Sequence, residues 1–80
     1  MNMDSQAVGH TITVTIDGVP KQIRQGRYLV SELKVALGVS PDLELDEVVD
    51  GEFQPVNDAS HVNLKEGDVF VSHVRRGGSS

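Results

Sequence analysis

Two Asp-Gly dipeptides constrain the fold of this chain more than any other feature of its sequence. Asp17-Gly18 follows a run in which apolar residues alternate with polar ones, and Asp50-Gly51 follows residues 43–49, in which the alternation of Leu43 and Leu45 is broken at Glu47. Asp-Gly favours a two-residue turn between antiparallel strands, because glycine adopts positive φ at little steric cost. Each dipeptide therefore predicts a β-hairpin.

The first hairpin has the clearest strand pattern in the chain. In residues 10–17 three β-branched apolar residues alternate with three threonines, which predicts a strand. Residues 19–25 are expected to return as a second strand with Val19 and Ile23 facing inward. Pro20 is typical of a sheet edge, so this strand is expected at a margin.

From Tyr28 the spacing of apolar residues changes to that of an amphipathic helix of about two to three turns. Gly38 suits a left-handed C-terminal cap, Val39 is expected to fold back onto the last turn, and Pro41 cannot continue the helix. The expected apolar side consists of Leu29, Val30, Leu33, Ala36 and Leu37, and the expected polar side of Ser31, Glu32 and Lys34.

The second hairpin follows the helix. Residues 43–49 predict a third strand, and residues 52–56 a fourth, with Phe53 as its anchor in the core. Pro55 marks this fourth strand as short and at an edge.

The chain ends in a polar connection and a last strand. Residues 57–67 are expected to run without regular structure, with Val62 and Leu64 in the core, before a strand over residues 69–74. The order is hairpin, helix, hairpin, loop, strand. It predicts an α+β fold with a mixed sheet of four to five strands and one helix packed across one face. The last strand is expected in the middle of the sheet, parallel to the first.

Composition restricts what the protein does. Eighty residues form one domain with little room for a catalytic pocket, so we expect a monomer that is not an enzyme. The chain has no cysteine, and thus no disulfide and no thiol nucleophile. A net charge of −5 argues against nucleic-acid binding. Residues 1–9 are expected to be a mobile leader, resembling neither a signal peptide nor a membrane anchor, which predicts a cytoplasmic protein.

Residues 75–80 carry the feature with the most chemical consequence. Arg75 and Arg76 contribute +2 to the net −5, so the remainder carries −7, and a basic tail on an acidic body steers toward an acidic partner. Gly77 and Gly78 have no Cβ, so an enzyme with a narrow slot can reach the Gly78 carbonyl. The same Gly-Gly-Ser-Ser run is typical of a flexible linker remnant, and the tail alone leaves both interpretations open.

Arg76-Gly77-Gly78 resembles the ending of ubiquitin and its relatives, and the order of elements is similar to the β-grasp fold of that family. The resemblance covers residues 10–78, with residues 10–74 as the β-grasp domain. It is strongest to the bacterial ubiquitin-like proteins encoded with an activating enzyme, a conjugating enzyme and a JAB-type protease.

The resemblance implies a modifier precursor. A JAB-type or other deubiquitinase-like protease would remove Ser79-Ser80, and an activating enzyme using ATP would adenylate Gly78 and form a thioester. A conjugating enzyme would then transfer the chain to target proteins. Two alternatives remain open: a sulfur carrier with a C-terminal thiocarboxylate, although that family ends at its second glycine, and a β-grasp interaction module whose tail is incidental.

The residues expected to serve this function lie at the end of the chain. Gly77 and Gly78 form the processing and conjugation site, and Arg75 and Arg76 contact the activating enzyme or protease. Phe70 is expected to point away from the core as part of a partner surface. Ser72 falls where, counted back from Gly-Gly, ubiquitin presents a valine of its binding patch.

Other ionisable residues predict no cofactor or metal site. The histidines lack metal-ligand spacing, and the acidic run over residues 42–50 lacks a calcium-loop pattern, so both are expected on the solvated surface. The lysines are expected to be ordinary surface residues; the alternative is that they accept further copies of the modifier when chains are built. The residues concerned are His10, His61 and His73, the acidic Asp42, Glu44, Asp46, Glu47 and Asp50, and Lys21, Lys34 and Lys65.

Overall fold

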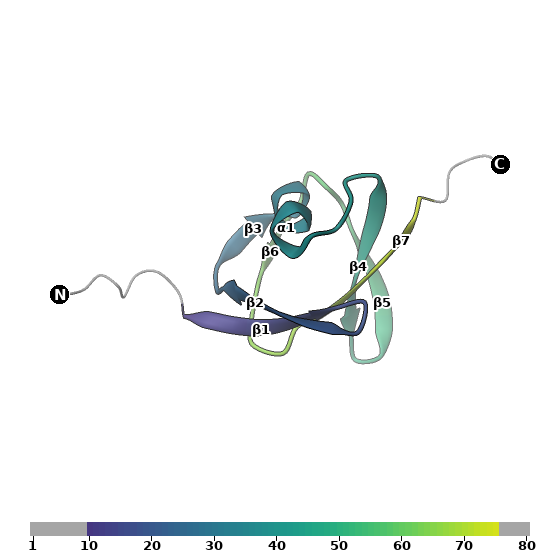
Figure 1. Cartoon of the computed structure of the whole chain (residues 1–80). Coiled ribbons are helices and arrows are strands. Elements are labelled where there is room, and N and C mark those ends of the chain that lie inside the picture. The colour runs from purple at the N-terminus through teal and green to yellow at the C-terminus, as the bar shows by residue number, and fades with distance from the viewer. Residues whose placement is uncertain (1–9, 76–80) are drawn as a thin grey trace.

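The computed structural model describes residues 10–75, and these form a mixed five-stranded sheet with one helix packed across it (Figure 1). The sheet has the order β2-β1-β7-β4-β5, and a separate two-stranded sheet pairs β3 with β6. The strands are β1 (Thr11–Ile16), β2 (Val19–Arg24), β3 (Arg27–Leu29), β4 (Leu43–Val49), β5 (Glu52–Val56), β6 (His61–Asn63) and β7 (Val69–Val74), and the helix is α1 (Val30–Leu37).

Both predicted hairpins are confirmed. β1 pairs antiparallel with β2 and β4 with β5, each across an Asp-Gly turn. In the first turn Asp17 and Gly18 have φ values of 53° and 81°, and in the second Asp50 and Gly51 have 52° and 78°. Positive φ at both central residues matches the right-handed twist of the flanking strands, which explains why these dipeptides direct hairpins.

The central position of the last strand is also confirmed. β7 pairs parallel with β1, aligning Ile16 with Phe70, and antiparallel with β4, from Leu43 opposite Val74 to Val48 opposite Val69. The first and last strands of the domain therefore lie side by side, and the sheet closes only when both ends of the domain come together.

The helix is shorter than predicted at its start. Residues 27–29, of which Tyr28 and Leu29 were expected in the helix, instead form β3 opposite β6, a pair that the sequence pattern did not reveal. The backbone N–H groups of Val30 and Ser31 donate to the carbonyl oxygens of Ser60 and Asp58, at 2.9 and 3.2 Å. The loop over residues 57–60 therefore caps the helix, so no side-chain capping residue is needed at the start of α1.

The other end of α1 is as predicted. Gly38 adopts the left-handed conformation with φ 79°, and the N–H of Val39 donates to the carbonyl oxygen of Lys34 at 2.8 Å. Val39 packs back into the core and is 8% exposed.

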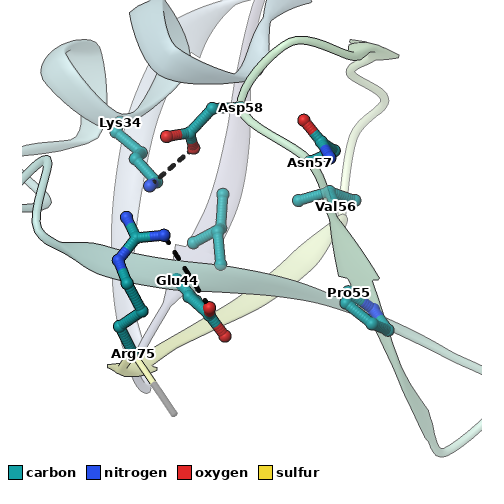
Figure 2. A pocket seen from close by; sticks show the side chains of 8 residues that line it. Lys34, Glu44, Pro55, Val56, Asn57, Asp58 and Arg75 are labelled. Atoms are coloured by element: carbon teal, nitrogen blue, oxygen red, sulfur yellow. Dashed lines mark ion pairs between the residues drawn. The ribbon is translucent and has the colours of Figure 1, made fainter. Parts of the chain in front are cut away.

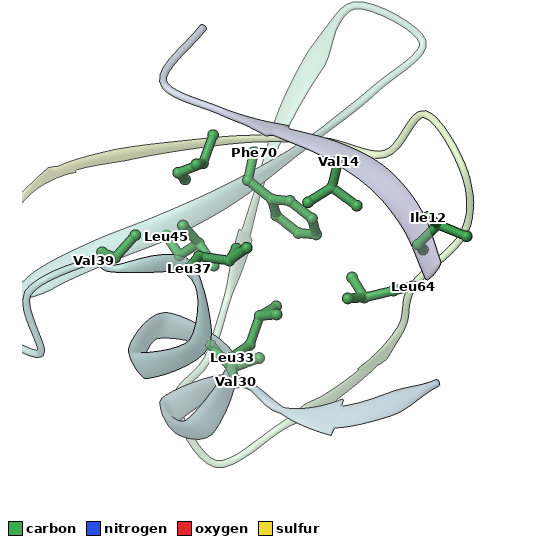
Figure 3. Close-up of a cluster of buried hydrophobic side chains, with 10 residues drawn as sticks. Ile12, Val14, Val30, Leu33, Leu37, Val39, Leu45, Leu64 and Phe70 are labelled. Atoms are coloured by element: carbon green, nitrogen blue, oxygen red, sulfur yellow. The ribbon is translucent and has the colours of Figure 1, made fainter. Parts of the chain in front are cut away.

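The core lies between the helix and one face of the sheet, and Phe70 of β7 is completely buried in it (Figure 3). Val62 and Leu64 pack in or against this core as predicted. The buried apolar residues are Ile12, Val14, Ile16, Val30, Leu33, Leu37, Val39, Leu45, Leu64 and Phe70.

Two aromatic residues have exchanged the roles expected from the sequence. Phe70, predicted to face outward, is 0% exposed, and Phe53, predicted to anchor β5 in the core, is 65% exposed. Phe70 aligns with Ile16, and both face the helix, whereas Phe53 lies opposite Val48 on the outer face. Both strands carry apolar residues on both faces, so alternation alone does not determine which face is buried.

These observations define an α+β, β-grasp-like fold. Within residues 10–75 no helix is long and apolar enough to cross a membrane.

The two phenylalanines provide a matched test of this core. Phe70→Ala is expected to lower the free energy of unfolding by about 3–5 kcal/mol, because it empties a packed site in a small domain. Phe53→Ala is expected to change it by less than about 0.5 kcal/mol. Urea unfolding followed by circular dichroism measures both, and equal losses would contradict the assignment of faces.

Candidate functional site

The candidate site is the C-terminal end of β7 and the surface around it. β7 ends at Val74, which is 72% exposed although its strand is central. Arg75 follows at the surface, and its guanidinium lies 3.9 Å from a carboxylate oxygen of Glu44. Arg76, Gly77, Gly78 and the Ser79-Ser80 extension lie outside the described residues, so their predicted roles remain predictions.

A groove of about 350 Å³ lies beside Arg75 (Figure 2). The side chains of Lys34 and Arg75 reach into it from opposite sides, each with a carboxylate partner, Asp58 and Glu44 respectively. Its lining consists of Lys34, Glu44, Leu45, Pro55, Val56, Asn57, Asp58 and Arg75.

Lys34 is not the surface lysine that the sequence predicted. It is 2% exposed, its ammonium lies 2.7 Å from Asp58 Oδ1, and it donates to the carbonyl oxygen of Leu43. Residues 57–60 fold over the start of α1 and bring Asp58 to the ammonium, which offsets the cost of burying the charge. The helical pattern correctly placed polar residues at positions 31 and 32, but it contained no information about this loop.

Asp17 links the first hairpin to β7. Its carboxylate accepts hydrogen bonds from the backbone N–H of Ser72, at 2.7 Å, and from the Ser72 hydroxyl. Its own N–H donates to the carbonyl oxygen of Phe70 at 3.0 Å. Ser72 is half-buried and faces the helix side of the sheet, opposite Leu45, and its predicted role in a partner surface stays a prediction.

The outer face of the sheet carries a different apolar group. Register places Val48, Phe53 and Val69 side by side across β5, β4 and β7, and Val71 lies two residues further along β7 on the same face. Alternation in β7 places Val69 and Val71 on the face opposite Phe70. The sequence would therefore have identified this group only if Phe70 had been assigned to the core.

His73 is half-buried and has acidic neighbours. Its Nε2 lies 3.2 Å from Asp46 Oδ2 and its Nδ1 lies 3.9 Å from Glu44 Oε1. Asp46, expected on a solvated face, is only 8% exposed, whereas His10 and His61 are exposed as predicted. Among residues 10–75 no group of three metal-ligating side chains is placed to hold an ion.

Comparison with known proteins finds no family model, no curated protein and no solved structure that matches this chain. The functional argument therefore depends on the β-grasp-like fold, the exposed end of β7 and the sequence that follows it.

The lysines should differ in reactivity. Lys34 is expected to be acylated by an amine-reactive reagent about tenfold or more slowly than Lys21 or Lys65, because local opening must first release its ammonium. Peptide mass spectrometry of briefly labelled protein measures the three rates, and the urea-unfolded chain serves as control. Labelling of Lys34 as fast as Lys21 would contradict the buried ion pair.

The two Asp-Gly turns isolate the contribution of the Asp17 carboxylate. Asp17→Ala is expected to lower the free energy of unfolding by about 1–3 kcal/mol more than Asp50→Ala, since both replace a turn aspartate with φ near 50° but only Asp17 binds Ser72. Urea denaturation of both variants provides the comparison, and equal effects would mean that the carboxylate adds nothing beyond the turn.

Proposed function

We propose that this chain is the precursor of a ubiquitin-like protein modifier. The observation that carries the proposal is that the central strand of the sheet, β7, ends at an exposed residue, Val74. The tail therefore starts from a strand that pairs with β4 up to Val74 itself. The sequence after Val74 is Arg-Arg-Gly-Gly, which suits capture by a second enzyme.

The proposed reactions all occur at Gly78. Hydrolysis of the Gly78–Ser79 amide releases Ser-Ser and leaves a carboxylate. That carboxylate attacks the α-phosphate of ATP and displaces pyrophosphate. A cysteine thiolate of the activating enzyme then displaces AMP to form a thioester. A cysteine of the conjugating enzyme then takes over the Gly78 acyl group and releases the thiol of the activating enzyme. A nucleophile of the target protein finally attacks the Gly78 carbonyl and releases the thiol of the conjugating enzyme.

This chain contributes access and charge to these steps. The absence of a side chain at Gly77 and Gly78 leaves the attacked carbonyl open. Arg75 is exposed, and its guanidinium nitrogen lies 3.9 Å from a carboxylate oxygen of Glu44. An exposed ion pair as long as this contributes little to the stability of the domain. Arg75 can therefore exchange Glu44 for an acidic residue of a partner at small cost.

The assignment to the bacterial ubiquitin-like proteins, with an activating enzyme, a conjugating enzyme and a JAB-type protease as partners in the cytoplasm, is supported only by the sequence resemblance. Gly78 ending as a thiocarboxylate is the sulfur-carrier alternative. The interaction-module alternative gains one specific observation, the exposed Phe53 with its valine neighbours on the outer face.

Intact-mass and peptide analysis in the source cell tests the proposal. An N-terminally tagged chain should lose the mass of two serines and form conjugates. Trypsin cuts after Arg76, so modified target residues should carry a Gly-Gly remnant. Gly78→Ala is the matched control and should retain Ser79-Ser80 without conjugates.

Each alternative predicts a different outcome of this experiment. Exchange of one oxygen for sulfur on the trimmed chain, with no conjugates, would favour the sulfur carrier. Full retention of the serines, with wild-type function after deletion of residues 77–80, would favour the interaction module and overturn the modifier proposal.

A further inference from the structure

The last residues of β7 are paired on one side only among the residues that the structure describes. Pairing with β4 continues to Val74, whereas pairing with β1 covers only Val69 and Phe70. β1 stops because the chain turns away at Asp17 to form the hairpin. The tip of β7, residues 72–74, therefore has an open edge on the side of β1.

Asp17 defines where this edge begins. Its carboxylate oxygen accepts the Ser72 N–H at the position that the next carbonyl of a longer β1 would occupy. The N–H and C=O of a strand residue point to the same side, and alternate residues share that side. The Ser72 carbonyl and the Val74 N–H therefore face the open edge, one acceptor followed by one donor.

A groove of about 410 Å³ lies next to this edge on the helix side of the sheet. Its walls include the buried apolar side chains of Ile16, Leu37 and Val39. Val19, which is 51% exposed, also lines the groove. Ser72 belongs both to the groove lining and to the open edge of β7. The groove thus offers an apolar cavity beside free backbone groups.

The charges around the groove select an acidic occupant. Lys21 is the one basic residue of the lining, and its ammonium lies close to Gly38 at the helix C-terminus. The one acidic residue of the lining, Asp17, already binds Ser72. Positive charge is therefore available to a partner, whereas the carboxylate is engaged within the domain.

We propose that this edge and groove accept an extended segment of the enzyme that acts on the C-terminus. The segment adds a strand to β7 at Ser72–Val74, inserts an apolar side chain into the groove, and places an acidic side chain near Lys21. Backbone hydrogen bonds supply affinity and the groove supplies specificity. The inference rests on the proposed function for the identity of the partner.

The two outer edges of the sheet are less suited to strand addition. β2 contains Pro20 and β5 contains Pro55. Proline lacks the N–H that a new strand would need, and it is a common protection of sheet edges. The tip of β7 has no proline and lies directly before the tail that must be held.

A peptide titration tests the docking surface without any enzyme. The probe is an acetylated and amidated pentapeptide, Glu-Val-Thr-Val-Glu, added to the full-length 15N- and 13C-labelled chain. Saturable chemical-shift changes are expected at the amides of residues 72–74 and the methyl groups of Val19 and Val39. Backbone amide changes centred on residues 22–24 of β2, which lie away from the groove, or on β5 would overturn the proposal.

Two pairs of variants separate the contribution of the groove to peptide binding from that of the backbone hydrogen bonds. Val19→Glu is expected to weaken peptide binding about tenfold or more, whereas Val35→Glu, at a valine 74% exposed on α1, leaves it unchanged. Val74→Pro removes the N–H at the open edge and should abolish saturable binding. Val74→Thr retains the N–H and should bind. Equal binding within either pair would contradict the proposal.

Processing assays distinguish this inference from the proposed function. If the chain is trimmed and activated in the source cell but Val19→Glu and Val74→Pro react at the wild-type rate, the docking proposal fails and the modifier function stands. If no trimming occurs but the pentapeptide docks with the expected variant pattern, the modifier function fails and the edge remains a strand-addition site.

Discussion

The burial of Phe70 is the constraint on which the rest of the structure depends. Its ring fills the space between the helix and the central strands, so β7 is fixed between β1 and β4 with one face toward the core. A domain of this size buries only about 60% of its unfolded surface, so one aromatic side chain is a large part of its core. The face to which Phe70 points also determines which residues of β7 a partner can reach.

The backbone of the fold could be predicted from the sequence because its signals are local. Two Asp-Gly turns, the alternation in β1 and the Gly38 cap each depend on residues near one another, and all are found where expected. What could not be predicted depends on distant contacts. Lys34 is buried because the loop carrying Asp58 covers it, and β3 forms because β6 lies beside it.

The candidate site shows the same division. The sequence identified the end of β7 as the place to look, and the structure places Val74 and Arg75 at the surface there. The predicted orientation of Phe70 was wrong, since Val69–Val74 carries apolar residues on both faces and alternation could not choose between them. The link from Asp17 to Ser72 spans 55 positions, and no local pattern indicates such a contact.

The parallel pairing of β1 with β7 has a practical consequence. Because β1 and β7 run in the same direction, the start of β1 and the end of β7 lie at opposite ends of the sheet (Figure 1). A fluorescent protein or affinity resin joined ahead of β1 would therefore stand at the far pole of the domain from Arg75. In pull-down experiments of that geometry, the attached group would not cover Arg75.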